Sequence, residues 1–452
     1  MATTMTTTSP PHPSSTLVNI SDDADPRLIR VLAPSTPNPS SFESACASAI
    51  SNGDAAGLLR TVISNGAIAG LLQSGYTIDE AVSAFSLLTV YLNRVGDAKV
   101  ERELCGALAE AVDKAGQQKN GGVVREEEEE GMMREKQSAM VAALFNLRSN
   151  GNEKVKLLTK IVELADVSAL SPGEARGVCA LADMLDASTL KASLVLWGGD
   201  GIDSDELRAL YEAVAKGMDR VLARLAKGEE DKATVMKSNA AKERKQTYML
   251  LFLETYKDAS KLDAKATSYA REASIYAIRE PINLFSTQRR ILTLPAVSAL
   301  QKSQPALYDL LKIFMEGKLQ DYRDFTAMPD KMTVFATFKI NEDQCMKNMC
   351  LLSLVSLAGE HEEIPYSAIA STLNVPEDNV EQWVIRAVSS GLMEAKMDQL
   401  RKVVLVERCA VRQFGKKEWG ALKVRLDTWK ANVKGVLDAL EKSGAVAPED
   451  GQ

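Results

Sequence analysis

Apolar side chains recur every three or four residues along most of this chain, the spacing that places them on one face of an α-helix. Thr77–Arg94 is an example, with Thr77 as N-cap and Glu80 three residues later, as in a capping box. Similar stretches, separated by short breaks, occupy Ser44–Ile50, Val100–Ala115, Glu135–Arg148, Asn152–Ala165, Ser171–Met184, Glu206–Lys227, Lys242–Lys257, Ala264–Arg279, Pro281–Leu292 and Gln304–Glu316. No strand pattern precedes residue 360. The fold predicted for this part is a mostly α, irregular right-handed α-solenoid of helix pairs.

The C-terminal quarter has a different pattern. Its elements, in order, are a helix over Asp343–Ala358, an extended stretch at Glu363–Tyr366, helices over Ser367–Leu373 and Pro376–Gly391, and strand-like runs at Leu392–Met397 and Lys402–Arg408. Asp398–Arg401 joins the two runs as a hairpin turn. This order predicts a winged helix. The helix that would enter DNA carries Glu377, Asp378 and Glu381 against Arg386, so we do not expect it to bind phosphates.

A single long helix is predicted after the wing, over Lys416–Lys442. Its apolar residues alternate in steps of three and four, which is an a/d seam of three heptads: Trp419, Leu422, Leu426, Trp429, Val433, Val436 and Leu440. The helix would be roughly 40 Å long, which exceeds a small winged domain. We therefore expect it to bundle with helices of other chains, although folding back on its own solenoid is a competing interpretation.

These patterns divide the chain into four parts. Residues 1–40, rich in Thr, Ser and Pro, are predicted to be a disordered tail, with a short apolar patch at Leu28–Leu32. Residues 41–240 form the N-terminal helical repeats. Residues 241–410 form a second domain, helical over 241–340 and a winged helix over 341–410. Residues 411–452 hold the bundling helix and a tail.

Composition removes several classes of function. Of the two histidines in 452 residues, His12 lies in the tail and His361 in a predicted loop. A Ser–His–Asp triad needs a positioned imidazole and a zinc hydrolase usually needs two or three, so neither is expected. The sequence offers no catalytic, cofactor-binding or metal-binding residues, so an enzyme is not expected. Six cysteines without a CxxC pair are typical of reduced thiols in a cytoplasmic protein. No apolar run is long enough to span a membrane. The glutamate run 126–130 is interpreted as a solvated loop or a frayed helix start.

Charge is uneven along the chain. Arg401–Lys442 holds eleven Lys and Arg against five Asp and Glu, a net charge of +6. Because the whole chain has a net charge of −7, the residues outside this segment carry −13. Candidate contacts for RNA or an acidic partner are Arg408, Arg412, Lys416 and Lys417. A solvated rim or an acidic neighbour is one interpretation, and ribosomal RNA is the other.

Four short motifs near the C-terminus carry a resemblance to a known family. They are KMDQ at Lys396–Gln399, RKVV at Arg401–Val404, RQFGKKEW at Arg412–Trp419 and WKANVKGV at Trp429–Val436. Together with the helical solenoid and the winged helix, they resemble the PCI domain family. Its members are subunits of the proteasome lid, the signalosome and translation initiation factor 3, and these motifs are most similar to the initiation factor members.

The resemblance implies a non-catalytic scaffold with no cofactor and no small-molecule substrate. Its expected partners are other initiation factor 3 subunits, both PCI-type and helical-bundle neighbours, and the small ribosomal subunit, with support of mRNA recruitment. The edge of the strand at Val403, Val404 and Val406 is a further expected interface, because an edge strand can extend a partner's sheet. A proteasome-lid or signalosome subunit and an RNA-binding adaptor are the competing interpretations.

Overall fold

The structure is a computed structural model that describes residues 24–72, 76–117, 127–165, 170, 181–227, 231–258, 262–283, 291–410, 412 and 416–442. His12, Glu126, Cys179 and most of the helix predicted over Ser171–Met184 lie outside these residues. The described chain divides into two compact units, Met1–Tyr248 and Met249–Gln452. The division falls within α12 (Lys232–Glu254), close to the predicted boundary at residue 240.

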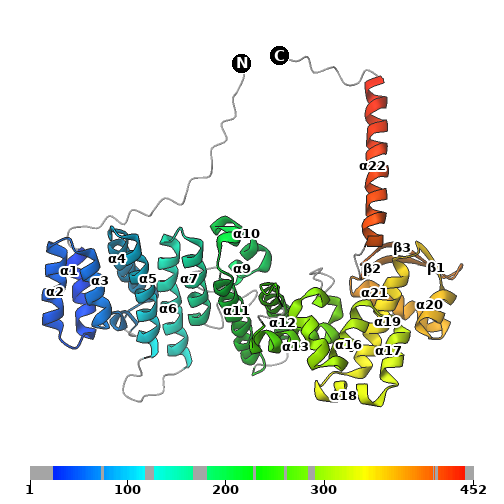
Figure 1. Cartoon of the computed structure of the whole chain (residues 1–452), viewed down its shortest axis with the longest axis horizontal. Helices are drawn as coiled ribbons and strands as arrows, with labels where there is room; N and C mark the ends of the chain where they lie inside the picture. The colour runs from blue at the N-terminus through cyan, green and yellow to red at the C-terminus, as the bar shows by residue number, and fades with distance from the viewer. Residues whose placement is uncertain are drawn as a thin grey trace. The chain divides into compact units, whose positions relative to one another are not determined.

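The first unit is built from helices that pack on their neighbours along the chain (Figure 1). They are α1 (Ala24–Leu32), η1 (Ala33–Ser35), α2 (Pro39–Ser51), α3 (Ala55–Ser64), η2 (Ala67–Leu72), α4 (Ile78–Asn93), α5 (Ala98–Gln117), α6 (Glu127–Leu147), α7 (Gly151–Leu164), α9 (Leu181–Met184), α10 (Ala187–Trp197), η3 (Gly199–Gly201) and α11 (Ser204–Leu225). The predicted helical-repeat fold is confirmed. Glu127–Glu130 lie in the first turn of α6, which agrees with a helix start rather than a loop.

The beginning of α4 shows how local sequence fixes a helix. The Glu80 backbone N–H donates to Thr77 Oγ1 at 3.3 Å, and the Thr77 N–H donates to Glu80 Oε2 at 2.9 Å, which is the predicted capping box. These hydrogen bonds satisfy amide groups that the first turn leaves without helical partners. The face that follows buries Phe85, Leu88 and Leu92 completely.

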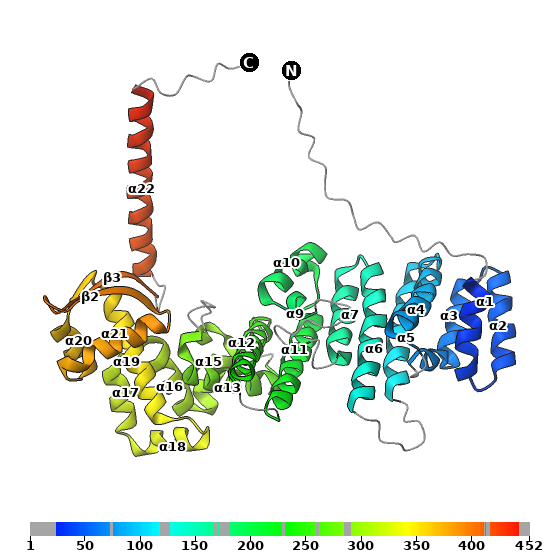
Figure 2. The same cartoon turned by 180° about the vertical axis from the view of Figure 1, so that it is seen from behind.

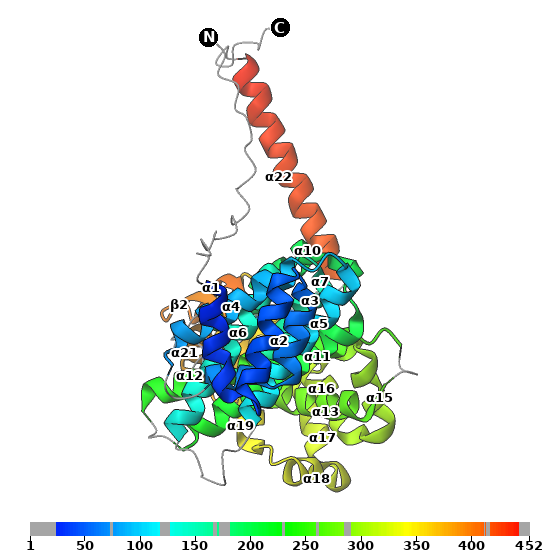
Figure 3. The same ribbon diagram turned by 90° about the vertical axis from the view of Figure 1, so that its left-hand side faces the viewer.

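The prediction of a disordered tail is wrong for residues 24–40. Leu28 and Leu32 on α1 are buried, and the helix lies beside α2 in the view of Figure 3. The apolar patch predicted at Leu28–Leu32 does dock locally. The Ser/Thr/Pro composition of residues 1–40 favoured disorder, but few apolar residues suffice for a nine-residue helix that only covers the edge of the unit.

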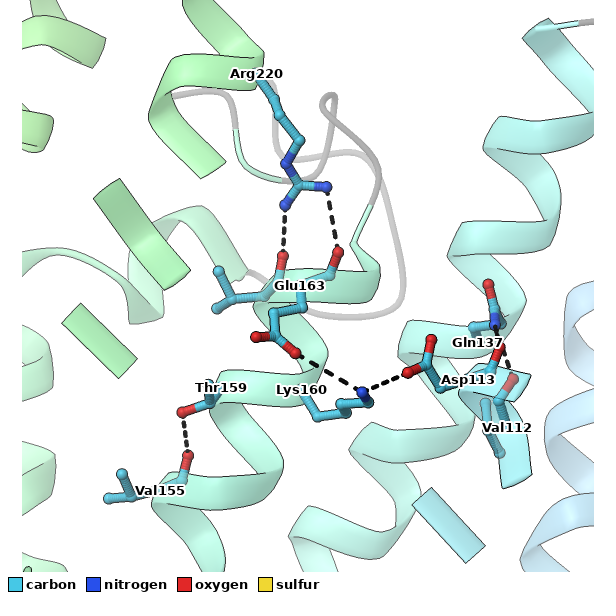
Figure 4. Close-up of polar contacts among 9 residues, drawn as sticks. Val112, Asp113, Gln137, Val155, Thr159, Lys160, Glu163 and Arg220 are labelled. Atoms are coloured by element: carbon cyan, nitrogen blue, oxygen red, sulfur yellow. Dashed lines mark hydrogen bonds and ion pairs between the residues drawn. The ribbon is translucent and has the colours of Figure 1, made fainter. Parts of the chain in front are cut away.

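Polar side chains link helices of this unit that pack against one another (Figure 4). Gln137 of α6 donates to the Val112 carbonyl of α5 at 2.8 Å, and Lys160 of α7 pairs with Asp113 of α5 at 2.5 Å. Arg220 of α11 donates to the carbonyls at the end of α7, including Val162 O at 2.8 Å. These carbonyls have no partner within their own helix, so the guanidinium both caps α7 and fixes α11 against it.

The second unit consists of a helical part and a winged helix with a small sheet (Figure 2). Its elements are α13 (Ala264–Arg279), η5 (Ile291–Thr293), α15 (Pro295–Ser303), α16 (Pro305–Glu316), α17 (Leu319–Thr326), α18 (Pro329–Thr337), α19 (Glu342–Ala358), β1 (Glu363–Pro365), α20 (Tyr366–Leu373), η6 (Glu377–Asn379), α21 (Val380–Ser389), β2 (Met393–Asp398), β3 (Val403–Cys409) and α22 (Lys416–Lys442). The short helices α17 and α18 were not predicted. Their buried Tyr322, Phe325 and Phe335 form a cluster of edge-to-face rings.

Candidate functional site

The predicted winged helix is present, with all its elements in the expected order. Gly391 follows α21 with φ +70°, and the Leu392 N–H donates back to the Ala387 carbonyl at 3.1 Å. A glycine adopts this left-handed conformation without a Cβ clash, so α21 can stop there and the chain can turn directly into β2. Ile364, Val384 and Val404 are buried between the sheet and the helices and hold the module together.

The sheet corrects the prediction for Val403, Val404 and Val406. The strand order is β1-β3-β2, so β3 is the central strand and forms antiparallel pairs on both sides. Val404 pairs with Ile364 on one side and with Met397 on the other. An edge role for β3 is therefore wrong. Among the described strands, each outer one pairs only with β3, and β2 is the longer of the two.

The tip of the wing is shaped by its turn. Asp398 Oδ1 accepts hydrogen bonds from the N–H groups of Leu400 at 3.1 Å and Arg401 at 3.0 Å. This Asx-type turn closes the hairpin and leaves the Leu400 side chain 99% exposed. Gln399 donates to Glu381 at the start of α21, at 3.1 Å, which fixes the wing against that helix.

Cations of the wing are paired with carboxylates of the same module. Arg401 lies 2.7 Å from Glu363, and Lys402 lies 2.9 Å from Glu377. Two further pairs cross the hairpin, Lys396 with Glu407 at 2.5 Å and Arg408 with Glu394 at 3.7 Å. Each pair is exposed and therefore contributes little to stability, but together they neutralise the positive charge that a phosphate backbone would need.

Arg412 is not a surface contact. Its guanidinium donates to three main-chain carbonyls at the end of α16: Ile313 at 2.7 Å, Phe314 at 2.5 Å and Gly317 at 2.7 Å. Burial lowers the pKa of Arg412 to about 10. The predicted contact with RNA or an acidic partner is therefore wrong for this residue, which caps a helix about a hundred residues earlier in the chain.

The other three predicted cations have different outcomes. Arg408 is exposed on β3, where it lies 3.7 Å from Glu394. Lys416 and Lys417 begin α22, and their side chains lie outside those that the structure describes. Of the four predicted cations, the structure thus describes the side chains of Arg408 and Arg412, and these two have different partners, Glu394 and the end of α16.

The predicted seam lies along α22, which is an uninterrupted helix over the predicted range Lys416–Lys442. Every seam side chain is exposed: Trp419 59%, Leu422 36%, Leu426 54%, Trp429 67%, Val433 40%, Val436 60% and Leu440 40%. Tryptophans exposed to this degree are uncommon, and a continuous exposed apolar stripe marks a surface that another protein covers. The seam is thus the strongest candidate for a partner interface in the described chain.

The described residues contain no group of His, Cys, Asp and Glu that could hold a metal ion. Burial raises the pKa of Cys345 to about 12, which keeps this thiol protonated and unreactive. His361 is exposed in the loop before β1, as predicted. None of the helices described is both long and apolar enough to cross a membrane.

Comparison with known proteins gives two matches to families. Residues 319–408 match the PCI domain, and residues 412–440 match the family described as eIF3 subunit M, C-terminal helix. The resemblance to the PCI family, and within it to initiation factor 3, is confirmed.

Curated relatives extend this similarity. Eukaryotic translation initiation factor 3 subunit M of Dictyostelium discoideum is 33% identical over 215 residues, which is 46% of this chain and 52% of the relative. The protein of the same name from Aspergillus fumigatus is 33% identical and covers 46% of each chain. That from Aspergillus terreus is 30% identical over 305 residues, or 66% of this chain and 60% of the relative. The chain thus spans about half the length of the curated relatives it matches.

Proposed function

We propose that this chain, which contains a PCI domain and a C-terminal helix similar to that of eIF3 subunit M, is a non-catalytic scaffold subunit of eukaryotic translation initiation factor 3. One observation carries the proposal: the matched segment, residues 412–440, includes most of α22, and the apolar seam of α22 is exposed from Trp419 to Leu440. In this role α22 enters a bundle with helices of other subunits. The assembled factor acts in the cytoplasm, where it binds the small ribosomal subunit and supports mRNA recruitment.

The winged helix supplies the second contact of this proposal. Because β3 is central, a neighbouring PCI subunit would add its strand to the outer edge of β2 rather than to β3. β2 offers six residues of backbone for such pairing. Leu400 and Met397, exposed near the wing, would be covered by the same neighbour.

Binding of RNA through the wing is the competing function, and the ion pairs weigh against it. Arg401, Lys402 and Arg408 each lie near a carboxylate of their own module, and Arg412 is committed to the end of α16. A phosphate contact would have to displace these partners. Contact with the ribosome would then come mainly through the assembled factor.

The test uses single substitutions in the full chain, expressed with an affinity tag in its own cells. Leu426→Asp places a charge within the seam, whereas Val424→Asp places the same charge on the outer face of α22, where Val424 is 65% exposed. We expect Leu426→Asp to lose the other initiation factor 3 subunits and Val424→Asp to keep them. Equal recovery of partners by both variants would rule out the seam as the assembly surface.

A further inference from the structure

The charged residues beside the seam of α22 are mostly cations. If Trp419, Leu426 and Val433 occupy a positions and Leu422, Trp429 and Val436 occupy d positions, the e and g positions flank them. Over the first half of the helix these flanking residues are Glu418 and Arg425 at g, and Lys423 and Lys430 at e. Three of the four are therefore cations. The next flanking residues, Asn432, Leu437 and Ala439, are uncharged.

These three cations are available to a partner. Lys423, Arg425 and Lys430 are exposed, and in the described part of the chain no ion pair includes any of them. They differ in this respect from the cations of the wing, each of which already has a carboxylate nearby. Positive charge that the module itself leaves uncompensated lies along the seam, not on the wing.

A second copy of the same helix fits this surface poorly. In a parallel pair, g residues face e residues of the next heptad, so Arg425 would meet Lys430 of the other copy on both sides, which offsets the two Glu418–Lys423 pairs of the same arrangement. In an antiparallel pair that overlaps the whole seam, e residues face e residues, so Lys423 would meet Lys430 twice. The antiparallel arrangement therefore places like charges together, which is destabilising, and the parallel one gains nothing overall from its charges.

We propose that the seam of α22 recognises a helix of a different chain whose apolar stripe is flanked by aspartate and glutamate, and that Lys423, Arg425 and Lys430 select it. This inference rests on the proposed function, in which α22 enters a bundle, and adds the chemistry of the neighbour. The apolar residues supply most of the affinity, while the flanking cations exclude basic helices and favour an acidic helix over a second copy of α22.

The test presents the full-length chain with two fluorescent synthetic helices that differ only beside their seam. Both carry the same Leu/Ile stripe and the same outer residues, but one has Glu at every e and g position and the other has Lys. Binding is measured by anisotropy at about 50 mM and about 500 mM salt. We expect the Glu helix to bind about tenfold tighter at low salt, with the difference shrinking at high salt.

Substitutions assign the preference to residues. Lys430→Glu should reduce it, whereas Lys434→Glu should not, because Lys434 occupies a b position outside the flank. The triple variant Lys423→Glu/Arg425→Glu/Lys430→Glu should prefer the Lys helix. Helix content measured by circular dichroism shows that each variant keeps its fold.

Three other outcomes would contradict the inference, and they differ in whether the proposed bundle also fails. Equal affinity for the two helices at low salt would overturn the charge selection and leave the proposed bundle intact. Binding of neither helix by the wild-type chain would contradict both. A dimer of the full chain in sedimentation velocity that Trp429→Asp disrupts would also overturn the inference, since the seam would then accept a second copy.

Discussion

Replacing Arg412 by methionine tests whether this residue stabilises the fold or contacts a partner. Methionine fills a similar volume but donates no hydrogen bond, so three carbonyls at the end of α16 would lose their donor. A hydrogen bond to a charged group contributes about 1.5–3 kcal/mol, which gives roughly 4–9 kcal/mol for three. Burial of the guanidinium opposes this. A pKa lowered from 12.5 to about 10 corresponds to about 3 kcal/mol. The net loss we expect is about 3 kcal/mol.

The assay is native-state hydrogen exchange of the full chain, followed by mass spectrometry of peptides from α16. A loss of about 3 kcal/mol should make their exchange about a hundredfold faster. Arg408→Met is the matched control, because that arginine is exposed and lies 3.7 Å from Glu394, and it should leave α16 unchanged. Unchanged exchange in Arg412→Met, together with weaker binding of RNA, would refute the structural role and restore the predicted surface role.

Three further outcomes are expected. Arg220→Met should destabilise the end of α7 by about 2–3 kcal/mol, detected as faster exchange of α7 peptides. Leu32→Ala should cost about 2–4 kcal/mol in urea unfolding of the first unit, whereas a disordered residue would cost nothing. Burial raises the pKa of Cys105 to about 11 and of Cys345 to about 12, so unfolded thiols ionise first, and stability should fall as pH rises from about 9 to 11. Slow alkylation of both thiols at pH 8 in the native chain would agree with this.

Elements with a strong local signal were predicted well. The seam of α22 and the capping box of α4 depend on residues within one helix, so the sequence was sufficient to predict both. The start of α12 was missed by ten residues, because its first half has no buried residue before Ala241 and therefore no apolar periodicity. The Thr234 N–H donates to Asp231 Oδ1 at 2.6 Å at the start of this segment, and this N-cap bond is not visible in apolar spacing.

The errors at the candidate site have a common cause, which is contact between distant segments. From local sequence Arg412 is predicted to be a surface cation, but in the fold it donates to α16, about a hundred residues earlier in the chain. From local sequence β3 is predicted to be the second strand of a hairpin with one free edge. In the fold that edge pairs with β1, which is three residues long and lies forty residues earlier. The sequence around Arg412 does not indicate its contact with α16, and the sequence around β3 does not indicate its pairing with β1.

The most direct test of the assembly proposal is native affinity purification of the tagged full chain from its own cells, with quantitative mass spectrometry of the co-eluting proteins. Recovery of the other subunits of initiation factor 3 in amounts equal to the bait, together with proteins of the small ribosomal subunit, is the predicted result. Recovery of proteasome-lid or signalosome subunits in their place, or of the chain alone with RNA, would contradict the account.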